Sequence, residues 1–155
     1  MLHAFMVASP VVPASHILVG TAQGVEIRRL VDGRPAAQTP PDVGGVGGPI
    51  AVDDERLYFV NDASHLVVAQ LDEARVVATV PGIDPGLPPV LAPNGLLVCG
   101  AGSWLLARHD HWLPSLSPWA PDLDGRPTSP AILHQGRVYV GIQGRGLVCL
   151  DGGDQ

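Results

Sequence analysis

Lysine is absent from this 155-residue chain, and its only basic side chains apart from six histidines are nine arginines. With 15 acidic residues, the formal net charge is −6 at pH 7. A protein that binds nucleic acid through the phosphates needs a basic patch or stripe on its surface. The composition therefore indicates that nucleic acid is not a partner of this protein.

Cysteines and long apolar runs are equally scarce. Cys99 and Cys149 lie far apart, without the paired spacing of a disulfide scaffold or a zinc module. No apolar run approaches the length of about 20 residues that a membrane span needs. The first 16 residues lack a basic segment and are interrupted by Pro10 and Pro13, which disfavours a signal peptide. A cytoplasmic protein is expected, and a periplasmic or secreted one if a leader has been removed.

Glycine and proline are abundant, at 19 and 16 residues, while 46% of the chain is hydrophobic. The apolar content argues against disorder, and the length suits one domain with a core of its own. Many short strands joined by turns account for this mixture. A single all-β domain over residues 1–155 is the expectation.

An internal repeat of about 40 residues is the strongest pattern in the sequence. Each unit starts with a proline, followed by a short apolar run, a polar turn, and two further apolar runs. The prolines are Pro10, Pro49, Pro89 and Pro130. The second runs start at Ile17, Leu57, Leu96 and Val138, and the third at Val25, Leu66, Leu105 and Leu147. The runs are short, rich in β-branched residues and bounded by turn residues, which predicts strands and not helices.

Several short strands per unit at this period predict a β-propeller of four-stranded antiparallel blades, four per chain. The blades would span about 9–41, 48–82, 88–121 and 129–155. The last blade lacks an outer strand, and the apolar segment 2–7 is predicted to supply it. The residues of this closure strand are Leu2, Ala4, Phe5 and Val7. It would cover backbone groups that an open sheet edge leaves unpaired.

The segments SPVV, ERLYFV, SPAI, GRVYVG and GLVCLD resemble the pyrroloquinoline-quinone-like propeller repeat. The resemblance implies a propeller fold but no activity, because the family contains quinone-dependent dehydrogenases as well as non-enzymatic scaffolds such as the outer-membrane assembly lipoprotein. Two features of quinoproteins are missing from this chain: the Gly-x-x-x-Trp docking motif that usually ends their blades, and the vicinal cysteine pair of quinone-dependent alcohol dehydrogenases. Trp104, Trp112 and Trp119 all fall in the third blade, off that pattern. No quinone or other cofactor is therefore expected.

Three assemblies remain open for four blades. Two chains could form one eight-bladed ring around a twofold axis, each closure strand completing the partner's last blade. One chain could instead close a four-bladed ring, or form part of a larger propeller or complex. Twofold symmetry is the commonest form of self-association, so the dimer is favoured.

Candidate catalytic and metal-binding residues are few. His109 and His111 would share one face of a strand, but no third metal ligand is nearby, so a solvated strand end is favoured. Asp122 and Asp124 indicate a turn between blades and not a calcium loop, and 53–55 indicates a solvated turn. No serine or cysteine triad is evident. Both cysteines lie in apolar runs and are expected to be inert, and no metal site is predicted.

The turn between the second and third strands of each unit ends in a different side chain. These residues are Gln23, His65, Trp104 and Arg145. The propeller resemblance implies that they share one face with the loops that carry Asp84 and Asp124. Varied polar and aromatic tips on a regular framework are typical of a recognition surface, although ordinary loop variation is the simpler alternative.

The predicted function is a non-catalytic scaffold for protein–protein interaction or assembly, with another protein or a second copy as partner. Two alternatives remain. One is an enzyme that uses the centre of the ring: a lyase or hydrolase with His65 or His109 and a carboxylate, or a quinone-dependent oxidoreductase. The other is a sensor that binds a small ligand in the central channel.

Overall fold

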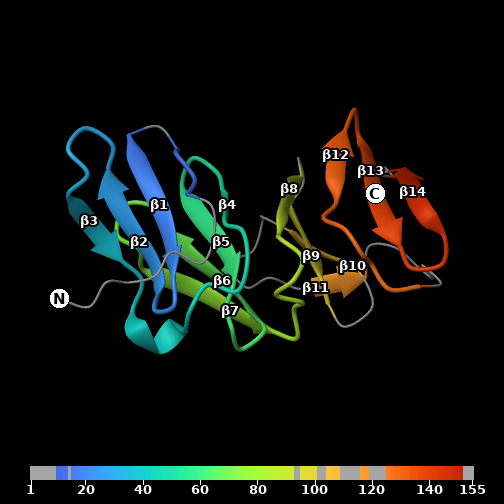
Figure 1. Cartoon of the computed structure of the whole chain (residues 1–155), viewed down its shortest axis with the longest axis horizontal. Coiled ribbons are helices and arrows are strands. Elements are labelled where there is room, and N and C mark those ends of the chain that lie inside the picture. The colour runs from blue at the N-terminus through green and yellow to red at the C-terminus, as the bar shows by residue number, and fades with distance from the viewer. Residues whose placement is uncertain are drawn as a thin grey trace.

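The computed structural model describes residues 10–13, 15–92, 95–100, 104–108, 116–118 and 125–151. In this part of the chain, antiparallel strands form four separate sheets, and the single-turn 3-10 helix η1 (Pro41–Val43) is the one helical element (Figure 1). The all-β prediction is confirmed. No helix in the described part of the chain is long and apolar enough to cross a membrane.

Each sheet is a meander, in which strands that follow one another along the chain lie side by side. The first sheet contains β1 (His16–Thr21), β2 (Gly24–Arg29) and β3 (Pro35–Gln38). The second contains β4 (Ala51–Val52), β5 (Arg56–Val60), β6 (His65–Gln70) and β7 (Val76–Pro81). The third contains β8 (Val90–Ala92), β9 (Gly95–Cys99), β10 (Trp104–Arg108) and β11 (Leu116–Pro118). The fourth contains β12 (Ile132–His134), β13 (Arg137–Ile142) and β14 (Gly146–Asp151).

The second and third apolar runs of every repeat unit fall in strands. The second runs form β1, β5, β9 and β13, and the third runs form β2, β6, β10 and β14. The first run of the first unit contributes only one bridge, between Val11 and Leu18. The predicted closure strand, with Leu2, Ala4, Phe5 and Val7, lies outside the described residues and stays a prediction.

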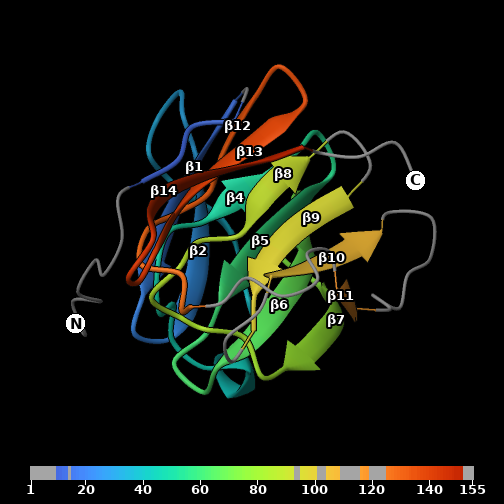
Figure 2. The ribbon, with the colours of Figure 1, turned by 90° about the vertical axis from the view of Figure 1, so that its right-hand side faces the viewer.

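The first strands of the second, third and fourth sheets lie next to one another. The strand β8 contacts both β4 and β12, as the turned view in Figure 2 also shows. The first and fourth sheets lie at opposite ends of the long axis, and no comparable contact joins their described strands (Figure 1). The described strands therefore form an arc with two ends.

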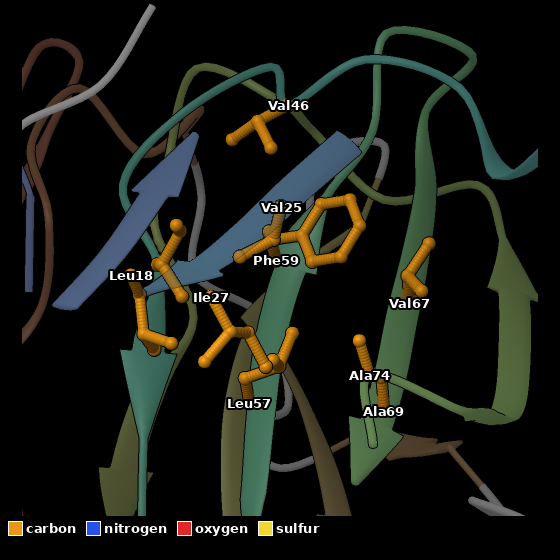
Figure 3. Close-up of a cluster of buried hydrophobic side chains, with 10 residues drawn as sticks. Leu18, Val25, Ile27, Val46, Leu57, Phe59, Val67, Ala69 and Ala74 are labelled. Atoms are coloured by element: carbon orange, nitrogen blue, oxygen red, sulfur yellow. The ribbon is translucent and has the colours of Figure 1, made fainter. Parts of the chain in front are cut away.

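A hydrophobic cluster fills each space between successive sheets. Between the first two sheets, Leu18 and Ile27 pack against Leu57 and Phe59, all fully buried (Figure 3). Because side chains alternate along a strand, Tyr58 and Val60 point the other way and join the cluster facing the third sheet. This two-sided burial explains why β5 is apolar without interruption from Leu57 to Val60. A third cluster, with Val138, Val140 and Ile142, joins the fourth sheet to the third.

Candidate functional site

The connections between sheets and the turns between second and third strands lie at the same end of the sheets. Each connection makes a bridge to the end of the second strand of the sheet it enters. The bridges are Val46 to Asn61, Ile83 to Gly100, and Pro127 to Ile142. Figure 1 shows η1 and the turns after β1 and β13 on the lower side of the molecule. We call this end the loop face; it contains residues 22–23, 43–48, 61–65, 82–88, 104, 125–128 and 143–145.

Gln23 lies exposed in the two-residue turn between β1 and β2. The Thr21 hydroxyl donates to the carbonyl of Gly24 at 2.9 Å and accepts from the backbone N–H of Gln23 at 3.1 Å. Gly24 has a φ of 117°, and a Cβ there would overlap the Thr39 hydroxyl. The backbone under Gln23 is thus held in one shape, while its side chain faces solvent.

His65 starts β6 and is half-buried, and Asn61 holds the turn before it. Asn61 is 4% exposed, and both the nitrogen and the oxygen of its side-chain amide form hydrogen bonds. Its Nδ2 donates to the Val43 carbonyl at 2.7 Å, and its Oδ1 accepts from the N–H groups of Ala63 at 3.1 Å and His65 at 2.8 Å. Asn61 therefore ties the first connection to the second sheet. The sequence interpretation missed this residue, although an Asn directly after an apolar run is typical of such a turn.

Asp84 links two successive connections on the loop face. Its Oδ1 accepts from the N–H of Gly86 at 2.8 Å, and its Oδ2 lies 3.3 Å from Nη2 of Arg126. Its own N–H donates to the Cys99 carbonyl at 2.7 Å. The Asp84 carboxylate is half-buried and engaged within the protein. Asp84 therefore has a structural role, because it holds the second connection to the third connection and to the end of β9.

The Cys99 thiol lies beneath these contacts of Asp84 and is 1% exposed. Burial, followed by the charge of Asp84, raises the pKa of the Cys99 thiol to about 11. Because only the thiolate is nucleophilic, Cys99 is inert at neutral pH, in agreement with the sequence interpretation. Cys149 differs, since its side chain is exposed in β14. The predicted inertness of Cys149 stays a prediction.

Arg145 projects from the turn between β13 and β14 and is exposed. Its N–H donates to the Ile142 carbonyl at 3.1 Å, and the flanking Gly144 and Gly146 have positive φ values of 79° and 75°. Trp104 is the first residue of β10, opposite Cys99 at the same end of its sheet. Asp124 lies outside the described residues. On the loop face, Gln23 and Arg145 therefore lie in turns, Asp84 lies in a connection, and His65 and Trp104 start strands. Their role in binding stays a prediction.

Metal-binding and proton-transfer chemistry has little support in the described side chains. Within the described ranges, no group of three or more His, Cys, Asp or Glu side chains could hold a metal ion. His109, His111 and Asp122 lie outside those ranges.

Tyr58 donates its hydroxyl to Oδ2 of Asp53 at 2.6 Å. Burial of Tyr58, followed by this bond, raises the pKa of the Tyr58 hydroxyl. This pair holds the turn before β5, at the end opposite the loop face, so it has a structural role.

Comparison with solved structures decides the fold. BamB from Moraxella catarrhalis superposes with a TM-score of 0.70 and 13% identity, over 93% of this chain and 42% of BamB. The computationally designed Ika4 protein gives 0.74 and 12%, over 99% of this chain and 94% of Ika4. The quinohemoprotein alcohol dehydrogenase from Comamonas testosteroni gives 0.72 and 13%, over 96% of this chain and 33% of the enzyme.

The fold is propeller-like. The predicted resemblance to quinoprotein-type propellers is confirmed at the level of the fold, which is as far as identities of 12–13% reach. The chain spans less than half of BamB and a third of the dehydrogenase, but almost all of Ika4. No protein-family profile matches the chain, and no curated protein matches it in sequence.

Proposed function

We propose that this chain is a non-catalytic β-propeller platform for protein–protein interaction, and that its four sheets are four blades. The N-terminal segment 2–7 completes the fourth blade, and a second copy completes the ring. The observation that carries the proposal is the loop face, where Gln23, His65 and Arg145 end equivalent turns of three sheets. A rigid framework with different side chains at equivalent turns suits the recognition of a protein surface.

The construction of the loop face favours binding over catalysis. Asn61 makes two hydrogen bonds within its turn and one to Val43 of the first connection, and Asp84 bonds to Gly86 and Arg126. Catalytic acids and bases need to face a substrate with their acceptor or donor atoms. Here these polar groups hold the loops in place, and the exposed side chains of Gln23 and Arg145 present hydrogen-bonding groups of the kind that recognise a partner.

Site-specific photo-cross-linking in the source cells tests this proposal. A benzophenone amino acid is placed at Gln23, His65 or Arg145 on the loop face. Matched variants carry it at Asp54 and Asp72, exposed residues of the turns at the opposite end of the second sheet. A shared cross-linked protein is expected from the loop-face positions and not from the two controls.

Equal labelling from both ends of the sheets, or none from the loop face, would contradict the platform function. Metal analysis of the purified protein adds a second criterion. A stoichiometric metal ion would favour an enzyme over a platform, because it would supply a catalytic centre that the described side chains do not form.

A further inference from the structure

The fourth sheet repeats the second sheet position by position. In the second sheet, Tyr58 lies opposite Ala51 on one side and Val68 on the other. In the fourth sheet, Tyr139 lies opposite Ile132 and Cys149 in the same way. By this register Leu147 of β14 corresponds to Leu66 of β6. The same positions therefore carry apolar side chains in both sheets.

These equivalent positions differ sharply in burial. Tyr58 is 3% exposed, Leu66 is 0% and Val68 is 8%, because the third sheet covers them. Leu147, by contrast, is 76% exposed and Ile132 is 64% exposed. We call Ile132, Tyr139, Leu147 and Cys149 the fourth-sheet end face. It keeps the apolar character of an interface between sheets, yet no described sheet covers it.

The first sheet, at the other end of the arc, also exposes an apolar residue whose equivalent in the second sheet is packed. The residues that follow β2 and β6 are equivalent. The N–H of Leu30, after β2, donates to the carbonyl of Ser15, and the N–H of Leu71, after β6, donates in the same way to the carbonyl of Glu55. Leu71 packs on the cluster between the first two sheets, whereas Leu30 is 49% exposed.

The register that follows from these hairpins places Ile17 and Val19 of β1 where Leu57 and Phe59 of β5 lie. In β5 these positions are fully buried against the preceding sheet, but the first sheet has no described sheet before it. We call Ile17, Val19 and Leu30 the first-sheet end face. The ion pair of Glu26 and Arg28, 2.7 Å apart, lies beside them on the same side of the sheet.

Within the chain, each of the three clusters between sheets joins a face equivalent to the fourth-sheet end face to a face equivalent to the first-sheet end face. The two ends of the arc therefore carry one face of each kind. We propose that the first-sheet end face of a second copy packs on the fourth-sheet end face, and that the reciprocal contact closes a two-chain ring. This inference rests on the proposed four-bladed propeller and names its partner and its interface. The union continues the sheet-on-sheet packing that builds each chain.

Two observations favour a second copy as the partner. One chain carries both faces, so two copies cover all four exposed ends at once. The two ends lie apart in the single chain, so it does not bury them against each other (Figure 1).

The Glu26–Arg28 pair distinguishes the new interface from those within the chain. In the second sheet the corresponding positions are Val67 and Ala69, both fully buried. Because Glu26 and Arg28 neutralise each other, their burial introduces no unpaired charge. Such a pair disfavours packing against a misaligned apolar sheet and so helps to set the register of the contact.

Light scattering coupled to size exclusion measures the outcome directly. The native protein is expected at twice 16.1 kDa. The single variants Leu147→Asp and Ile132→Asp are expected at 16.1 kDa, because each places a charge in the apolar contact. Both residues are exposed in the single chain, so neither change should unfold it. The control Thr79→Asp, exposed in β7, should keep the dimer.

The reactivity of Cys149 shows which face is covered. In the native dimer, a bulky maleimide should modify Cys149 at least about tenfold more slowly than in monomeric Leu147→Asp, since access limits the reaction. Cys99 is the internal control, because it is buried in both forms. Equal rates at Cys149 would show that the dimer uses another surface and would overturn the inference.

The other outcomes separate this inference from the platform function. A native protein that stays monomeric at high micromolar concentration overturns the ring, as does a dimer that survives both aspartate variants. Neither result affects cross-linking from the loop face, which tests the platform independently. Conversely, a dimer that is broken by Leu147→Asp but gives no loop-face cross-link confirms the ring and overturns the platform function.

Discussion

Replacing Phe59 by alanine tests whether the sheets are held together by the clusters between them. Phe59 is fully buried in the centre of the cluster that joins the first two sheets (Figure 3). Truncating a buried phenylalanine costs about 3–5 kcal/mol, from lost burial and from the cavity left behind. Domains of ordinary stability unfold at a cost of about 5–15 kcal/mol, so the loss is a large part of the total.

Urea unfolding followed by circular dichroism gives the measurement. With an m value of about 2 kcal/mol per molar urea, the Phe59→Ala midpoint should fall by about 2 M. The control Val31→Ala changes a side chain that is 87% exposed, in the turn after β2, and should shift the free energy of unfolding by less than about 0.5 kcal/mol.

A loss below about 1 kcal/mol for Phe59→Ala would refute the packing described above, because no filled core position is so tolerant. Hydrogen exchange adds a spatial criterion. Amides of β1, β2, β5 and β6 should lose protection most, since these strands flank the cavity. Uniform loss across all four sheets would instead show that the clusters unfold as one unit.

Three further predictions follow from single side chains and backbone positions. Asn61→Ala should lower the free energy of unfolding by about 2 kcal/mol in urea titrations, since it removes three hydrogen bonds and leaves partly buried backbone groups without these partners; an unchanged midpoint would contradict this. Gly24→Ala should destabilise the protein more than the matched Gly33→Ala, because both have positive φ but only Gly24 faces the Thr39 hydroxyl. The folded-state pKa of Cys99, about 11, lies above the value of about 8.5 for an unfolded thiol, so the unfolded state loses its proton first. Stability should therefore fall as pH rises from about 8.5 towards 11, and fall less steeply in Cys99→Ala; identical slopes would refute the assignment.

Much of the local structure was predictable from the sequence. Runs such as Arg56–Val60 and His65–Gln70 are short, rich in β-branched and aromatic residues, and flanked by turn residues, so each predicts a strand without tertiary information. The repeating prolines place the start of each unit. The loop face was predictable in outline for the same reason, since a regular repeat brings its equivalent turns to one end.

The contributions of single polar side chains were less accessible. Asn61 resembles any turn residue in the sequence, and its bond to Val43 depends on a connection that arrives from the preceding sheet. The bond from Tyr58 to Asp53 is likewise set by the register of β4 against β5. These contacts join residues whose proximity the repeat alone does not specify.

The two cysteines separate what the sequence by itself determined from what the tertiary structure decided. Cys99 and Cys149 both lie in apolar strand runs, and the sequence correctly placed each in a strand. Strand formation depends on local pattern, because alternation and turn chemistry act over a few residues. Burial depends on whether another sheet covers that face. The fourth sheet covers Cys99, but no described sheet follows β14, so Cys149 and Leu147 are exposed at the end of the arc.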